Sequence, residues 1–483
     1  MAMSAETKPP MVRFGLRPNR SLLLGLSGLR VACVGAAAVL VVAGLLLAGA
    51  LGLAAASLAW LPLIGAAFIK WRGRPAVEWF PTVAHWALRA TAGQTRYRAR
   101  LLEPRPAGTM ALPGDAAALR FFTDPDSGAC MIHDPHRQTL AAVIRVTHPA
   151  YILLAPDQQQ ARVAAWGRAL AGLAPSGTCS GVQILESTIC DGGEAVAAWY
   201  ADHGSPSNGW AAKEYRRLLS QSGNGATTHR STITLSLDMR RAARTIRDAG
   251  GGIRGAAHVL RGDMHGLEFG LRQAELRLQG WLDEDELAAM VRQAYEPNRV
   301  GGDSGRQGRG LATAGPTAID EHWDCLRHDS AWSTVLWVSE WPRVEVPAHF
   351  LHGLIFAPGV RKTICLLARP HTAADALRQI RREKTEMLTD AATRARIGQI
   401  ADLSDSQHYA DVAAREQALV CGHADMAFWG FITVTAATRP ELTAAVAQIE
   451  RAATGAACET RIVYGAPAQA FVVAALPLGR TTV

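Results

Sequence analysis

The sequence lacks the short motifs that mark the common nucleotide-dependent and hydrolytic enzymes. Only five of its 483 residues are lysine, and none of them follows a glycine. A Walker A loop needs Gly-Lys followed by Ser or Thr, because the lysine reaches the phosphates and the hydroxyl holds Mg²⁺. The G-x-S-x-G elbow and the H-E-x-x-H zinc motif are also absent. We therefore expect a protein that is not an enzyme and that needs no cofactor.

Charged residues are missing from Val31 to Ile69, a run of 39 residues. One transmembrane helix needs about 20 apolar residues, so this run is about twice one span. Basic residues flank both ends, and cytoplasmic flanks attract Lys and Arg. The run therefore predicts a two-helix transmembrane hairpin in the plasma (inner) membrane, turning near Gly49 and Gly52, with both termini cytoplasmic. The alternative is one long tilted span, which would export the stretch from Lys70 onwards.

The basic excess of the chain lies around this apolar run. The first hundred residues hold twelve Lys or Arg and two acids, whereas the whole chain has a net charge of +8, so the other 383 residues carry −2. A nucleic-acid-binding domain would carry its excess in the folded part, so we do not expect direct nucleic-acid binding. The basic flanks instead indicate membrane topology and contact with lipid.

Aromatic and basic side chains that suit the lipid headgroup region cluster at the ends of the run. The residues predicted to form this membrane interface are Arg30, Lys70, Trp71, Arg72, Arg74, Trp79 and Trp86. A juxtamembrane helix that packs on its own domain is the alternative interpretation.

The eight cysteines include no Cys-x-x-Cys pair and show no regular spacing. Zinc sites and disulfide frameworks usually show a pattern, so free thiols in a reducing compartment fit best. This agrees with a cytoplasmic soluble part.

Beyond the run, alternating strand and helix patterns predict an α+β fold of repeated ferredoxin-like strand-helix-strand units. Asp283 and Thr438 are expected helix N-caps, and the closing segment AFVVAALPLG is expected to be a strand. The predicted divisions are a basic cytoplasmic N-terminus (1–30), the hairpin (31–69), an interfacial segment (70–114), two cytoplasmic α+β domains (115–296 and 317–483) and a Gly/Arg-rich loop between them (297–316).

Two local clusters could carry chemistry. Asp320, His322, Asp324, Cys325 and His328 are the densest group of potential metal ligands, although solvated residues before a strand are the default interpretation. The residues 250–255 match G-x-G-x-x-G but do not directly follow a strand, as a dinucleotide site requires. We therefore predict neither a metal site nor a nucleotide site.

The segments VRFGLRPNRSLLLGLSGLR (12–30), STITLSLDMRRAAR, LRLQGWLDEDELAAMVRQAY, WVSEWPRVEV and VVAALPLG carry a resemblance. With the apolar run, they resemble an actinobacterial integral-membrane family encoded in conjugative-element gene clusters with type IV secretion-like parts. The layout is similar to a two-helix membrane subunit joined to the N-terminal domain of a conjugative ATPase, without the motor domain.

This resemblance implies a homo-oligomeric membrane scaffold that contacts lipid, recruits a separate ATPase and joins other channel subunits. Two other classes stay open: a membrane component of a type VII secretion complex, and a membrane-anchored enzyme.

Overall fold

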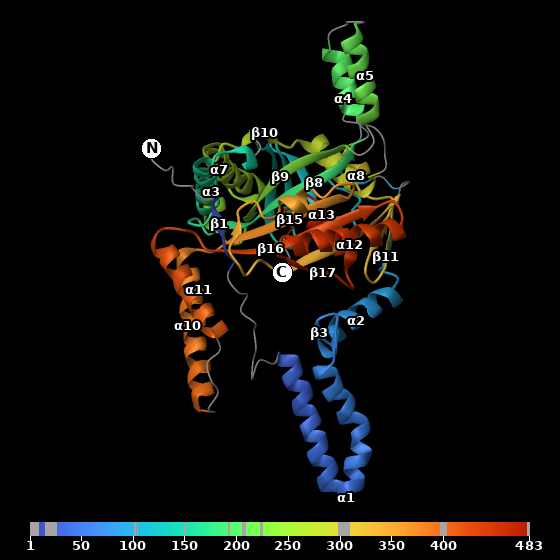
Figure 1. The fold of residues 1–483 in the computed structure, drawn as a ribbon, viewed down its shortest axis with the longest axis vertical. Coiled ribbons are helices and arrows are strands. Elements are labelled where there is room, and N and C mark those ends of the chain that lie inside the picture. Colours follow the sequence, from blue (N-terminus) through green and yellow to red (C-terminus); the bar gives the residue numbers. More distant parts are fainter. Residues whose placement is uncertain are drawn as a thin grey trace, which may run out of the picture. The chain divides into compact units, whose positions relative to one another are not determined.

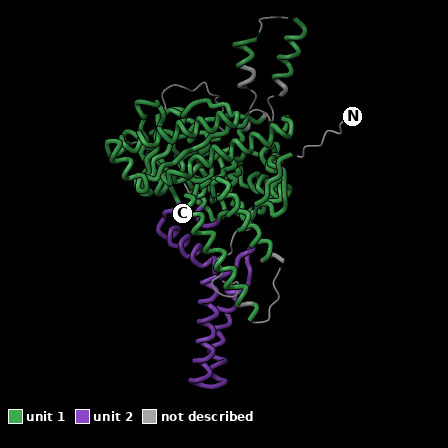
Figure 2. Tube along the Cα trace, turned by 90° about the vertical axis from the view of Figure 1, so that its left-hand side faces the viewer, with its two compact units in different colours: residues 1–16, 96–463, 467–483 green, residues 17–95, 464–466 purple. Residues whose placement is uncertain are grey.

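The computed structural model describes residues 9–14, 27–100, 103, 105–148, 151–191, 194–204, 209–222, 226–297, 310–396 and 403–480. The chain divides into two compact units, coloured separately in Figure 2. Unit 1 comprises Met1–Leu16, Arg96–Val463 and Pro467–Val483, and unit 2 comprises Arg17–Thr95 and Tyr464–Ala466. The chain therefore passes between the units four times.

Unit 1 is a mixed α+β unit built on one 13-stranded sheet in which every pairing is antiparallel. Its main path runs β4-β11-β12-β13-β16-β15-β8-β9-β7-β6-β5, with β10 paired to β7 and β17 to β13. The strands are β4 (Arg96–Arg98), β5 (Arg120–Thr123), β6 (Cys130–Asp134), β7 (Thr139–Thr147), β8 (Cys179–Asp191), β9 (Ala226–Asp238), β10 (Arg277–Trp281), β11 (Ala318–Glu321), β12 (Leu326–His328), β13 (Ala331–Glu340), β15 (Arg361–Pro370), β16 (Met426–Ala436) and β17 (Glu459–Ile462).

The same order of strands and helices occurs twice along unit 1. The first half runs β7, α3 (Pro156–Ala171), β8, β9, α7 (Gly252–Gln273), β10, and the second runs β13, α9 (His352–Ile355), β15, β16, α12 (Arg439–Gly455), β17. Their strands lie in matching order, β8-β9-β7-β10 and β15-β16-β13-β17. The halves meet where β8 pairs with β15, with Leu185 opposite Cys365. Each half also carries a helix pair between its second and third strands, α4–α5 (Glu194–His203 and Trp210–Ser222) and α10–α11 (Ala373–Arg396 and Leu403–Val420).

Alternating side chains divide the sheet into two apolar faces. On β7, Ala141 and Val143 enter one core, while Ala142 and Ile144 enter another beneath α3 and α7. On β16, Phe431 joins the first core, and its neighbours contribute to a third core beneath α9 and α12. This period of two is the ordinary consequence of strand geometry.

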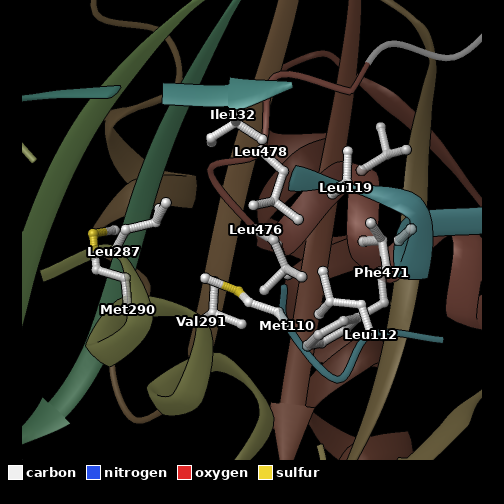
Figure 3. Close-up of a cluster of buried hydrophobic side chains, with 14 of the residues drawn as sticks. Met110, Leu112, Leu119, Ile132, Leu287, Met290, Val291, Phe471, Leu476 and Leu478 are labelled. Atoms are coloured by element: carbon white, nitrogen blue, oxygen red, sulfur yellow. The ribbon is translucent and has the colours of Figure 1, made fainter. Parts of the chain in front are cut away.

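The core shared by both halves lies under α8 (Glu284–Tyr295) and α13 (Pro467–Ala475). Figure 3 shows Leu476 in the middle of this core, between Leu287 and Met290 of α8 on one side and Phe471 of α13 on the other. The prediction that the closing segment is a strand is wrong, because its first part forms the helix α13. Short apolar runs do not distinguish a buried strand from a helix that is buried on all sides.

Both predicted N-caps are confirmed. The Asp283 carboxylate accepts from the Glu286 amide, and the Thr438 hydroxyl accepts from the Glu441 amide, so α8 and α12 each begin with a capping box. The remaining short elements of unit 1 are β1 (Met11–Val12), η1 (Gly114–Ala118), η2 (Tyr151–Leu153), α6 (Ala243–Asp248), η3 (Leu311–Thr313) and β14 (Val346–Pro347). β1 pairs with β14, which ties the stretch before the apolar run to the sheet-containing unit.

Unit 2 consists of α1 (Gly28–Phe68), the two-stranded β2–β3 turn (Lys70–Trp71 and Arg74–Pro75) and α2 (Ala76–Thr91), together with residues 464–466. Among the described residues, α1 is the one helix long and apolar enough to cross a membrane. That α1 crosses a membrane twice and that unit 1 consists of ferredoxin-like units remain predictions.

Candidate membrane interface

The outer surface of α1 is apolar and uncovered. Only Ala37 and Ala67 of its residues are buried, and just 6% of its most apolar stretch is buried inside the protein. Leu47 and Leu51 are 86% and 83% exposed. A water-soluble protein seldom exposes so long an apolar helix, so a membrane environment is the natural place for this surface.

The helical course of α1 is interrupted at its middle. Ala48 (φ −143°, ψ 20°) and Gly49 (φ 56°, ψ −135°) are non-helical, and the second of these conformations is one that glycine adopts most readily. On either side of the break, Gly44 and Gly52 approach so closely that a Cβ on Gly52 would lie 2.1 Å from the Gly44 carbonyl oxygen. Figure 1 shows the two parts of α1 running side by side.

Polar contacts connect the start of α1 to α2. The Ser27 hydroxyl donates to Glu78 Oε1 at 2.7 Å, and Arg30 Nε lies 4.0 Å from the same carboxylate oxygen. The Arg30 side chain is only 18% exposed, so this predicted interface residue also acts inside unit 2. Lys70 and Arg74 are exposed on the β2–β3 turn at the other end of α1.

Three aromatic rings meet beside this turn. Trp79 lies 4.8 Å from Trp71 and 5.3 Å from Tyr464 between ring centroids, and the Trp79 Nε1–H donates to the Trp71 carbonyl at 3.1 Å. The Arg72 guanidinium lies 5.0 Å from the Tyr464 ring centre and donates to its hydroxyl. Arg89 donates to the Gly465 carbonyl at 3.2 Å. Residues 464–466 are therefore an integral part of unit 2.

One face of α2 exposes a continuous apolar stripe. Phe80 (71% exposed), Val83 (44%) and Leu88 (70%) recur at helical spacing, with Ala87 also exposed beside them. Val77, in the first turn of the same helix, is buried. An amphipathic helix of this kind, placed directly after an apolar span, suits the boundary between headgroups and acyl chains.

The structure separates the predicted interface residues into two groups. Lys70, Arg74 and Trp71 lie at the surface, whereas Trp79 is 9% exposed and Trp86 is half-buried. Burial removes Trp79 from direct contact with solvent or lipid, because its ring fills the centre of the aromatic cluster. Sequence reasoning did not find Tyr464, because it is distant in the chain and lies in no recognisable motif. It also did not find Glu78, because a single acid on an amphipathic helix is too common a feature to mark a contact.

The candidate metal ligands do not converge. Asp320 pairs with Arg98 at 2.8 Å, and Asp324 pairs with Arg439 at 3.4 Å. His322 packs on the Trp332 ring. Among the described residues, no group of three or more His, Cys, Asp or Glu side chains could hold a metal ion.

The other two members of that cluster are buried in unit 1. Burial raises the pKa of Cys325 to about 12 and lowers the pKa of His328 to about 4. His328 Nδ1 lies 2.6 Å from the Tyr295 carbonyl oxygen, and its Nε2 lies 2.8 Å from the Ser333 hydroxyl. These contacts satisfy both ring nitrogens within the core, so His328 has a structural role there.

The glycine motif also has a structural explanation. Gly250, Gly251 and Gly252 all have positive φ at the start of α7, and a Cβ on Gly255 would lie 2.5 Å from the Ile246 carbonyl oxygen. The glycines therefore allow the turn between α6 and α7 and the close contact between these helices.

The exposed apolar helix α1, the basic residues Lys70 and Arg74 at its end and the amphipathic helix α2 are together typical of a membrane-associated protein. Residues 225–338 match the family described as the type VII ESX secretion system translocon EccE. The chain is thus similar, over the region from β9 to β13, to a membrane family of secretion systems. This supports the type VII alternative and not the conjugative one. No curated protein matches the chain.

Proposed function

We propose that this chain is a membrane component of a type VII-like secretion system. The match of residues 225–338 to the EccE family carries the proposal, and the exposed apolar helix α1 agrees with a membrane component. The matched region includes α7, β10 and α8, which belong to the first half of the sheet and its shared core.

We further propose that α1 crosses the plasma membrane twice. Residues 9–14 and the chain from Arg96 onwards both belong to unit 1, because β1 pairs with β14 and β4 pairs with β11. A folded unit lies on one side of a membrane, so the segment between these two attachments leaves and returns on the same side. The break at Gly49 and the basic residues at both ends agree with two crossings and a cytoplasmic unit 1.

At the cytoplasmic face, the α2 stripe and the collar of Lys70 and Arg74 would lie in the headgroup layer. Apolar side chains such as Phe80 and Leu88 gain by leaving water for the acyl boundary, and the basic groups gain by contact with anionic phosphates. Trp71 adds an amphipathic ring at the same depth.

Unit 1 would act as a non-enzymatic scaffold. The repeated order of strands and helices in its two halves supports the prediction that each half is a ferredoxin-like unit. Because the sequence has no Walker A lysine, any ATP-driven step would come from a separate ATPase subunit of the machinery.

The partner proposal is tested by purifying the tagged full-length protein from native membranes in mild detergent and identifying the proteins that accompany it by mass spectrometry. Recovery of type VII core subunits together with an ATPase is the expected result. A tagged unrelated two-span protein from the same membranes serves as the control for carry-over. Recovery of conjugative channel subunits, or of no partner even after cross-linking, would contradict the proposal.

The topology is tested separately by cysteine labelling in intact cells. Leu47→Cys reports on the middle of α1, and Gln94→Cys reports on the segment after α2, in a background where Cys33, Cys190 and Cys421 are serine. An impermeant maleimide should label position 47 from outside and position 94 only after the cells are opened. External labelling at position 94 would indicate a single crossing.

A further inference from the structure

The two helix pairs α4–α5 and α10–α11 occupy equivalent positions in the two halves of unit 1. Each connects the second strand of its half to the third, β8 to β9 and β15 to β16. Figure 1 draws each pair as a two-helix arm. We name them the first arm (α4–α5) and the second arm (α10–α11). The second arm is joined by ion pairs, whereas the first arm exposes two tryptophans, and this difference indicates different functions.

The second arm is held together by charged side chains. Arg415 on α11 lies 3.3 Å from Glu383 on α10 and 2.7 Å from Asp425 at the start of the next strand. Lys384 on α10 pairs with Glu416 on α11. These contacts join the two helices to each other and to the base of the arm, so the second arm is stabilised within a single chain.

Both arms expose apolar side chains, but of the two only the described part of the first arm exposes tryptophan. Tyr200 and Tyr215 join its helices through a ring contact of 4.8 Å between centroids. Outside this contact, Trp199 is 59% exposed, Trp210 is 80% exposed and Leu218 is 53% exposed. Two exposed tryptophans on one short arm are unusual for a surface that stays in water, and Trp is among the residues enriched at the hot spots of protein interfaces.

The exposed apolar area of the first arm has the size of half a small interface. With full side-chain areas of roughly 150–250 Å², the exposed parts of Trp199, Trp210, Tyr215 and Leu218 amount to roughly 500 Å². Two such surfaces would bury roughly 1,000 Å², close to the lower limit for a specific interface.

The charges of the first arm make it complementary to itself. The sequence of α4 contains Glu194 and Asp202 and no Lys or Arg, whereas α5 contains Lys213, Arg216 and Arg217 against one acid. A two-fold axis places the same patch of two copies face to face, so α4 of one copy can lie along α5 of the other. The acidic helix α4 of each copy would then lie against the basic helix α5 of the other copy, so the favourable charge contact would occur twice.

We propose that the first arm binds the first arm of a second copy of this chain, forming a four-helix contact with Trp199 and Trp210 at its centre. The second arm supplies the internal comparison, since it occupies the equivalent position and has its own stabilising ion pairs. The proposal concerns self-association and does not depend on the secretion function. It gives the predicted homo-oligomer a specific surface.

The test compares the full-length protein in mild detergent with two double variants, using light scattering after size exclusion at several protein concentrations. Trp199→Ala with Trp210→Ala removes the two exposed rings of the first arm. Leu388→Ala with Val420→Ala removes side chains that are 62% and 73% exposed on the second arm and serves as the matched control. All four side chains are mainly exposed, so we expect every variant to fold, which circular dichroism would verify.

The wild type and the second-arm variant should both dimerise, and the first-arm variant should show a dimer Kd at least about 30-fold higher, as expected when central tryptophans of an interface are truncated. If the wild type remains monomeric at all concentrations, the first arm does not bind a second copy of the chain, and the proposal is overturned. An equal loss of dimer in both double variants would also overturn it.

Discussion

Arg480, near the C-terminal end of the chain, joins the closing segment to the first half of the sheet. Its guanidinium donates to both carboxylate oxygens of Asp115, at 2.9 and 2.8 Å, and its Nε donates to Asp134 at 3.1 Å. The side chains of Arg480 and Asp134 are each 4% exposed, so their charges face each other largely without water. Replacing Arg480 by Met should destabilise unit 1, since the change leaves a buried carboxylate without its main cation.

The size of the expected loss in the free energy of unfolding depends on the partners that Asp134 keeps. Removing one member of a buried ion pair typically costs about 3–5 kcal/mol. Asp134 would still accept from the backbone amides of His136 and Arg137, at 3.0 and 3.1 Å, and the Arg137 side chain lies 4.0 Å away. We therefore expect a loss near the lower end, about 3 kcal/mol, which is a large share of an ordinary folding stability.

The assay is urea unfolding of the full-length protein in detergent, followed by tryptophan fluorescence. Arg382→Met is the control, because the Arg382 side chain is 82% exposed in a surface pair with Glu386 and should change stability by less than about 1 kcal/mol. The double variant Arg480→Met with Asp134→Asn should recover part of the loss, since it leaves no buried charge. A loss below about 1 kcal/mol for Arg480→Met alone would refute this account of the ion pair.

Two further stability predictions concern residues of unit 1. Burial lowers the pKa of His328 to about 4, below the value of about 6.5 in an unfolded chain, so only the unfolded chain takes up a proton as the pH falls from 6.5 to 4. The contribution of neutral His328 to stability should be fully present above pH 6.5 and fall by roughly 3 kcal/mol towards pH 4, and His328→Gln should remove that part of the pH dependence in urea midpoints. An unchanged pH dependence in the variant would contradict the prediction. Thr438→Ala removes the N-cap of α12 and should cost about 1 kcal/mol, whereas Thr443→Ala, inside the same helix, should cost less.

Local chemistry made several features of the fold predictable. Asp283 and Thr438 are found at the helix starts that the sequence indicates, because an N-cap depends on a side chain and an amide only three residues apart. The strand at 231–238 follows from alternating apolar residues, and Ile233, Leu235 and Leu237 are all buried. The apolar length of α1 likewise follows from composition alone.

Features that depend on distant contacts were not predictable. Tyr464 joins Trp71 and Trp79 although almost four hundred residues separate them, and no local pattern marks it. The dense run from Asp320 to His328 does not form a metal site, because β11 and β12 are paired strands whose side chains alternate between faces. The helix α13 has an apolar sequence that fits a strand equally well, and its burial between elements of both halves decides its structure.

The inclusion of residues 464–466 in unit 2 has a consequence for the time course of synthesis. The ribosome completes Trp71 and Trp79 long before it reaches Tyr464, and at about 5–20 residues per second the interval is roughly 20–80 s. Throughout that interval the nascent membrane segment lacks the ring that closes its aromatic cluster. With the membrane topology proposed above, α1 would enter the bilayer before Tyr464 is made, so insertion would precede the completion of unit 2.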